Sequence, residues 1–159
     1  MKTLEEALAP ARRRGASARN DARPTLSAMD SGEPEKDPEE IRLEARSRSE
    51  RRIAYIQEVF EADPVDPSWA PAAEAQIVEA VDSDLLQGSS LRALECRMRL
   101  CRAEVEHVGD RDFELFSREL PTRLDGLPRT TMKRLPSAGG LERTIMYAAR
   151  EGYRMPGPP

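Results

Sequence analysis

Two cysteines and the single histidine of the chain are the residues that could carry redox or metal chemistry. Cys96 and Cys101 are separated by Arg97-Met98-Arg99-Leu100, and His107 follows on the carboxyl side. If these four residues close a β-hairpin, the cysteines become a directly opposed cross-strand pair, close enough for disulfide geometry. A disulfide here would close a ring of six residues and contribute about 2 kcal/mol to stability. We therefore favour a structural disulfide, with ordinary buried thiols as the first alternative.

Redox catalysis and metal binding are the remaining alternatives for these side chains. Disulfide oxidoreductases favour Cys-x-x-Cys at a helix N-terminus, whereas this pair is predicted on strands. Cys96, Cys101 and His107 would give a metal three ligands, but a closed structural zinc site takes four and the sequence has no other cysteine or histidine. An acid such as Asp110 would have to be the fourth ligand. We expect no metal and no cofactor, and we expect His107 to be a strand residue with a satisfied ring nitrogen.

The sequence carries almost nothing that is typical of an enzyme. It contains no glycine-rich phosphate loop, no H-E-x-x-H pair and no nucleophile elbow, and one histidine limits acid-base chemistry. Glu104 and Glu106 share one face of a predicted strand, and paired carboxylates can catalyse hydrolysis. Alternating acids are, however, common on the solvated face of a strand. We predict a protein without catalytic residues, and a hydrolase is a minor alternative.

Two arginine clusters raise the question of a nucleic-acid partner. The first lies within residues 37–63 and consists of Arg46, Arg48, Arg51 and Arg52. That stretch has eight acids against five bases, so a solvated helix face explains it better. The second is Arg12-Arg13-Arg14, and three charges near acids give little affinity for nucleic acid or anionic lipid. With a net charge of -4 for the whole chain, we expect no nucleic-acid partner.

Periodicity and capping signals predict the elements that position these residues. Asp37-Pro38 starts a helix over 38–62 that stops before Pro64. A second helix begins at Asp66-Pro67-Ser68 and ends before Gly88, with Trp69 as an anchor between the two helices. Later elements are predicted as strands over 90–96 and 101–108, a helix over 111–120, and strands over 129–135 and 142–149 around the turn 137–140. A helix is the alternative for 141–151.

This order of elements predicts an α+β fold. Two N-terminal helices are followed by ββαββ, which packs most economically as a four-stranded antiparallel sheet with helices on one face. On the strand over 101–108, one side of the sheet is formed by Cys101, Ala103, Val105 and His107. We predict that residues 37–154 form a single domain between a disordered tail or linker, 1–36, and a disordered C-terminus, 155–159.

Targeting signals are the next question that the sequence can address. The first thirty residues lack the apolar core of a signal peptide, because acids and arginines interrupt the stretch where it would lie. No other stretch is apolar for long enough to cross a bilayer. As written, the sequence therefore predicts a cytoplasmic protein without a membrane-spanning segment.

Several short motifs resemble those of a family of small, uncharacterised exported bacterial proteins. The motifs are Asp66-Pro67-Ser68-Trp69-Ala70, the acid Glu74, Glu95-Cys96-Arg97 and the run from Leu100 to His107, and the resemblance covers roughly residues 50 to 152. Members of that family look as if they are built in one order. A signal peptide or membrane anchor comes first, a low-complexity linker follows, and a compact domain with a paired-cysteine hairpin comes last. The resemblance implies that Cys96 and Cys101 are the oxidised pair, that Trp69 takes part in helix packing, and that the protein is periplasmic or otherwise exported. It transfers no catalytic residue.

These observations lead to one preferred hypothesis and two alternatives. The preferred hypothesis is a non-enzymatic interaction or structural domain of the bacterial cell envelope, stapled by Cys96-Cys101 and acting on an unknown protein partner. The first alternative is a cytosolic regulatory or adaptor protein with reduced cysteines. The second is a metal-binding module or a hydrolase.

Overall fold

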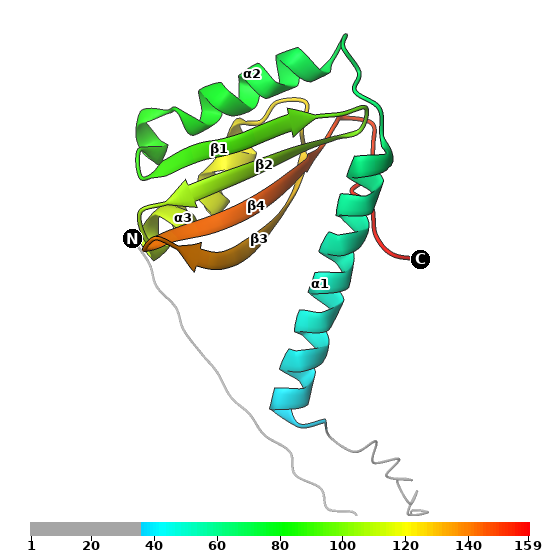
Figure 1. Cartoon of the computed structure of the whole chain (residues 1–159), viewed down its shortest axis with the longest axis vertical. Coiled ribbons are helices and arrows are strands. Elements are labelled where there is room, and N and C mark those ends of the chain that lie inside the picture. The colour runs from blue at the N-terminus through cyan, green and yellow to red at the C-terminus, as the bar shows by residue number, and fades with distance from the viewer. Residues whose placement is uncertain (1–35) are drawn as a thin grey trace, which may run out of the picture. The chain divides into compact units, whose positions relative to one another are not determined.

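The computed structural model describes residues 36–159, in which three α-helices accompany a four-stranded antiparallel sheet (Figure 1). The predicted α+β class and antiparallel sheet are therefore confirmed. The elements are α1 (Pro38–Ala62), α2 (Ala70–Val81), the 3-10 helix η1 (Asp84–Leu86), β1 (Ser89–Cys96), β2 (Leu100–His107), α3 (Asp110–Glu119), the 3-10 helix η2 (Leu120–Arg123), β3 (Arg129–Ala138) and β4 (Leu141–Ala149).

The strands lie in the order β1-β2-β4-β3, so two hairpins meet along β2 and β4. In this central pair Cys101 lies opposite Ala148 and Val105 lies opposite Thr144. The second hairpin turns at Gly139-Gly140, where φ angles of 61° and 80° favour glycine. Residues 141–149 are a strand, so the helical alternative for this segment is wrong.

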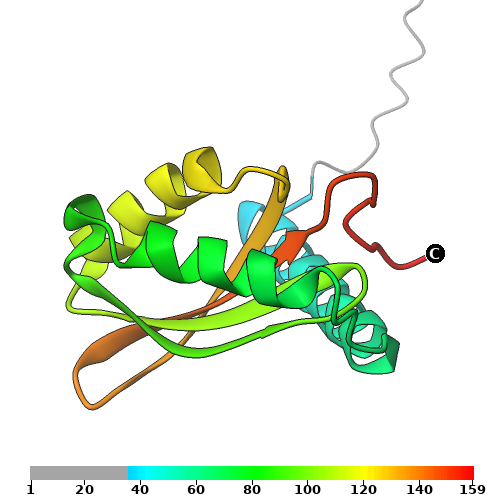
Figure 2. The ribbon, with the colours of Figure 1, turned by 90° about the horizontal axis from the view of Figure 1, so that it is seen from above.

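The two faces of the sheet are covered by different helices, which corrects the predicted arrangement with helices on one face. Figure 2 shows α2 and α3 above the sheet and α1 below one end of it. The upper core contains Cys101, Ala103 and Ala148 beneath α2 and α3, whereas Leu100 and Tyr147 pack against α1. Successive strand residues point to opposite faces, so this end of the sheet is apolar on both sides and needs two covers.

Helix α1 has the predicted bounds, but only its C-terminal half is packed. The Asp37 side chain accepts a hydrogen bond from the amide of Glu39 at 3.0 Å, and a proline occupies the first turn. The buried positions are Ile53, Ile56 and Phe60, whereas residues 38–52 are exposed. The domain is thus in contact with α1 over its last three turns only.

Helix α2 ends at Val81, seven residues before Gly88, so the predicted extent of this helix was wrong. Ser83 has extended backbone, with ψ of 148°, and a separate 3-10 turn follows it. Serine and aspartate compete with helical hydrogen bonds through their own side chains, and they stand at 82–84 here. Trp69 packs at the rim of the α2 and α3 core and not between α1 and α2.

The described residues form one compact unit, Lys36–Pro159. The predicted disordered tail, 1–36, lies outside the described residues except for its last position. The segment 155–159 carries no regular secondary structure, and Met155 packs against the apolar cluster that joins α1 to the sheet. Within residues 36–159, no helix combines the length and the apolar character that crossing a bilayer requires.

Candidate functional site

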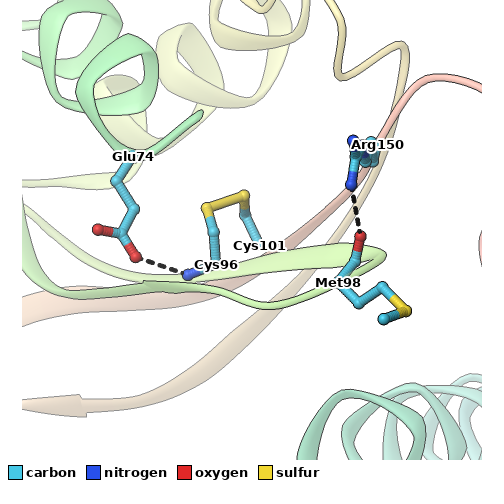
Figure 3. The surroundings of a disulfide bond; sticks show 5 residues. All are labelled: Glu74, Cys96, Met98, Cys101 and Arg150. Carbon is cyan, nitrogen blue, oxygen red and sulfur yellow. Dashed lines mark hydrogen bonds between the residues drawn. A yellow bond between two sulfur atoms is a disulfide. The ribbon is translucent and has the colours of Figure 1, made fainter. Parts of the chain in front are cut away.

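The paired cysteines close the β1–β2 hairpin and are joined as a disulfide (Figure 3). The register places Cys96 directly opposite Cys101, with a Cα–Cα distance of 3.9 Å. The turn between them is closed by a hydrogen bond of 2.8 Å from the Arg97 amide to the Leu100 carbonyl oxygen. Both cysteines have 0% exposure and lie in the core under α2. The bond is therefore part of the core and is not presented to solvent.

Glu74 of α2 holds the strand that carries the first cysteine. Its Oε1 accepts a hydrogen bond of 2.8 Å from the backbone amide of Cys96, as Figure 3 shows. Because β1 is an edge strand, an amide that points away from β2 has no strand partner, and the carboxylate satisfies it. Glu74 was noticed in the sequence only through the family resemblance. Its contact joins residues 22 positions apart, so local spacing could not reveal it.

Two arginines of the hairpin turn bind the C-terminal end of α1. Arg97 donates from Nη1 to the carbonyl oxygens of Glu61 and Asp63, at 2.8 and 3.2 Å, and its guanidinium lies 4.9 Å from the ring centroid of Phe60. Arg99 binds the Asp63 carboxylate through Nε and Nη2 at 2.6 to 3.0 Å. Cations are favoured at a helix C-terminus, where free carbonyl oxygens concentrate partial negative charge. We call the contacts of Arg97 and Arg99 with residues 60–63 the turn clamp.

The backbone of the same turn is held from two further sides. The Met98 amide donates to the Pro64 carbonyl oxygen at 2.8 Å, and the Met98 carbonyl oxygen accepts from Arg150 Nη1 at 3.3 Å. Arg150 also forms an ion pair of 2.8 Å with Asp66. Hydrogen bonds from Ser68 and then from Arg150 lower the pKa of Asp66 to about 2. The turn therefore ties together α1, the α1–α2 connection and the end of β4.

His107 is buried at the opposite end of β2 from the disulfide, about 20 Å away at 3.3 Å per strand residue. Its Nδ1 lies 2.8 Å from Ser89 Oγ and its Nε2 lies 3.1 Å from Thr144 Oγ1. Its ring packs on Phe116 at a centroid distance of 4.9 Å. Burial lowers the pKa of His107, so the neutral ring predominates near neutral pH. Both ring nitrogens have partners, as expected for a histidine in a structural role.

The three candidate metal ligands, Cys96, Cys101 and His107, are not brought together. Cys96 and Cys101 are bonded to each other, and His107 lies at the far end of the strand with hydroxyl partners on both nitrogens. Within the described part of the chain, no group of three or more His, Cys, Asp or Glu side chains is arranged to hold a metal ion. Asp110, the fourth ligand that the sequence offered, contacts Arg134 instead.

The Ser89–His107 hydrogen bond brings together a hydroxyl and a base, as a serine nucleophile would require. In that chemistry a third group orients the base, and a carboxylate commonly supplies this role. Here the third group is the Thr144 hydroxyl, and the hollow beside Ser89 and His107 has a volume of about 70 Å³. That volume is well below the about 300 to 1,000 Å³ of typical ligand sites. The arrangement therefore satisfies a buried histidine and leaves little room for a substrate.

The paired acids of β2 are engaged in ion pairs. Glu104 lies 2.6 Å from Arg102 and 3.8 Å from Arg143, and Glu106 lies 3.2 Å from Arg92. These side chains thus form a charged lattice on the sheet face below the core.

Comparison with known proteins identifies no family for this chain. No protein-family model matches the sequence, and no curated protein matches it. The functional argument therefore depends on the disulfide, the turn clamp and the surfaces around them.

Proposed function

We propose that this chain is a non-enzymatic interaction or structural domain of the bacterial cell envelope, stapled by Cys96–Cys101. The observation that carries the proposal is the complete burial of both cysteines under α2, together with the hydrogen bond from Glu74 to the Cys96 amide. A catalytic or sensing disulfide must be reached by an attacking thiolate, and a buried pair is protected from that attack. A disulfide that persists is typical of an oxidising compartment.

The turn clamp supports a structural role for the bond. The six-residue ring immobilises the turn, and the turn carries Arg97 and Arg99, which hold the end of α1. The disulfide therefore stabilises the contact of the hairpin with α1 as well as the hairpin itself. The proposal also includes an exported location, and two N-terminal helices followed by ββαββ as the order for the whole chain.

Thiol counting on protein taken from its native cells tests the proposal. Cells are quenched in acid, and the protein is alkylated in denaturant, because both side chains are buried in the native state. Intact mass is then measured before and after reduction. The proposal expects no adduct before reduction and two adducts after it.

Two free thiols in the unreduced sample would refute the envelope location and would support the cytosolic adaptor. A sample reduced before alkylation is the matched control for complete labelling. Catalytic turnover of a thiol substrate by the purified domain would refute the non-enzymatic part separately, because it does not depend on location.

A further inference from the structure

A groove runs between α2 and the loop that joins η2 to β3, which lie on the same side of the sheet (Figure 2). It consists of two adjoining hollows of about 350 Å³ each, and both are lined by Gln76 and Asp125. Each hollow is within the size range of ligand sites, and the α2-side lining residues of the two hollows follow one another along the chain from Trp69 to Ser83. This shape suits an extended chain better than a compact small molecule.

One end of the groove is apolar. Trp69 forms a wall, and Ala73 and Leu127, both buried, form the floor. The Arg150 guanidinium lies 4.7 Å from the centroid of the Trp69 ring and is held there by Asp66. A partly exposed tryptophan beside a fixed aliphatic floor is typical of an anchor pocket for an apolar side chain.

The middle of the groove is acidic. Asp125 lies in both hollows and Glu79 lines the second. Among the described residues, neither carboxylate lies within 4.0 Å of a cationic group. The stretch 64–91, which includes α2, contains five acids and no lysine or arginine. Arg123 is the one cation among the described residues that line the two hollows, and it lines the second together with Glu79 and Asp125. The surface therefore favours a cation and repels phosphate groups.

The walls are fixed before any ligand binds. The Gly126 carbonyl oxygen accepts a hydrogen bond of 2.8 Å from the Glu151 amide, which ties the loop to the end of β4. Gly126 has a φ of 76°, so the loop needs glycine at this point. On the other side, the Asp66 carboxylate accepts a hydrogen bond of 3.0 Å from the Ser68 amide in the turn that precedes α2. A preformed groove loses little conformational entropy on binding.

We propose that this groove docks an extended peptide segment of a partner protein in which an apolar residue is followed by lysine or arginine. The apolar side chain occupies the pocket of Trp69 and Leu127, and the cation lies between Asp125 and Glu79. The proposal deepens the proposed function, because it names the surface and the partner chemistry of the interaction domain. The negative charge of α2 argues against nucleic acid and anionic lipid as the occupant.

Trp69 is the only tryptophan of the chain and lies in the groove, so its fluorescence reports occupancy directly. The probe is an acetylated and amidated peptide of alternating leucine and lysine, titrated into the oxidised full chain at low salt. A peptide with glutamate in place of lysine is the control. We expect a saturable change with the lysine peptide, with a Kd of about 0.1 to 1 mM, and no saturation with the glutamate peptide.

Matched variants separate docking in the groove from general attraction to an acidic protein. Glu79→Gln with Asp125→Asn should raise the Kd at least about tenfold. Glu58→Gln with Glu114→Gln removes the same charge from exposed positions of α1 and α3 and should leave the Kd within about twofold. Equal weakening by the two double variants would overturn the proposal, as would a lysine peptide that does not saturate by about 5 mM.

The same experiment keeps this inference distinct from the proposed function. A disulfide that is intact in cells, together with no peptide binding, would reject the groove and leave the envelope domain standing. Free thiols in cells, together with binding that the groove variants abolish, would reject the envelope location and leave the docking surface standing.

Discussion

Removal of the disulfide should weaken the domain in two separable steps. The ring contains six residues, for which the chain-entropy model gives about 2 kcal/mol of stabilisation. Reduction of the wild-type protein removes this cross-link but leaves both sulfur atoms in place. Cys96→Ala with Cys101→Ala also empties two fully buried sites, and each methyl-sized void costs about 1 kcal/mol. We therefore expect the stability order oxidised wild type, reduced wild type, double variant.

Thermal unfolding followed by far-UV circular dichroism measures this order. For a domain of this size 1 kcal/mol corresponds to about 3 to 6 °C in Tm, so reduction should lower Tm by about 6 to 12 °C. The double variant should unfold at a still lower temperature and should not respond to reductant, which controls for effects of the reductant itself. A fully reduced wild type with the Tm of the oxidised protein would refute the reasoning, because the cross-link would then contribute nothing to the unfolded-state entropy.

Three further predictions concern other contacts. Asp63→Asn removes the charge that binds Arg99 and should cost about 1 to 3 kcal/mol in urea unfolding; an unchanged midpoint would show that the Arg99–Asp63 pair contributes no stability. Burial lowers the pKa of His107 below 6.5, so the unfolded chain binds a proton more readily than the folded domain. The free energy of unfolding should therefore fall as the pH drops from about 6.5. His107→Gln should abolish the part of this fall that His107 causes, when the free energy of unfolding is measured at a series of acidic pH values. Gly88→Ala should lower the Tm in thermal unfolding, because the added Cβ would overlap the Asp112 carboxylate and force that side chain to move, and a wild-type Tm would contradict that contact.

Local signals explain which parts of the fold could be predicted. Asp37-Pro38 and Pro64 fix both ends of α1 through capping and the missing amide of proline, and both signals act within one turn. The two-sided covering of the sheet was missed because it depends on Leu100 and Tyr147, which lie next to residues of the opposite face. Alternation identified one apolar face on β2, but it did not indicate that one end of the sheet is apolar on both sides.

The same distinction applies to the candidate site. The pairing of Cys96 with Cys101 follows from hairpin spacing, and the structure brings these residues together. The turn clamp could not be predicted, because Arg97 and Arg99 read as polar turn residues, and their partners lie more than 30 positions earlier. The groove beside Trp69 was missed for a similar reason. It forms only where α2 and the loop at Asp125 pack side by side.

Because half of α1 is unpacked, the turn clamp affects how the domain responds to a pulling force on this helix. Residues 38–52 are exposed and span about 22 Å at 1.5 Å per residue, so this half of the helix acts as a lever arm. A pull on its N-terminal end loads first the packing of Ile53, Ile56 and Phe60 on the sheet and then the Arg99–Asp63 contact, and the cross-link behind the turn keeps the hairpin closed. We expect optical-trap extension from residue 38 to release α1 in a first step while the sheet stays folded. The disulfide thus makes the hairpin a fixed anchor, and α1 is the part that yields under tension.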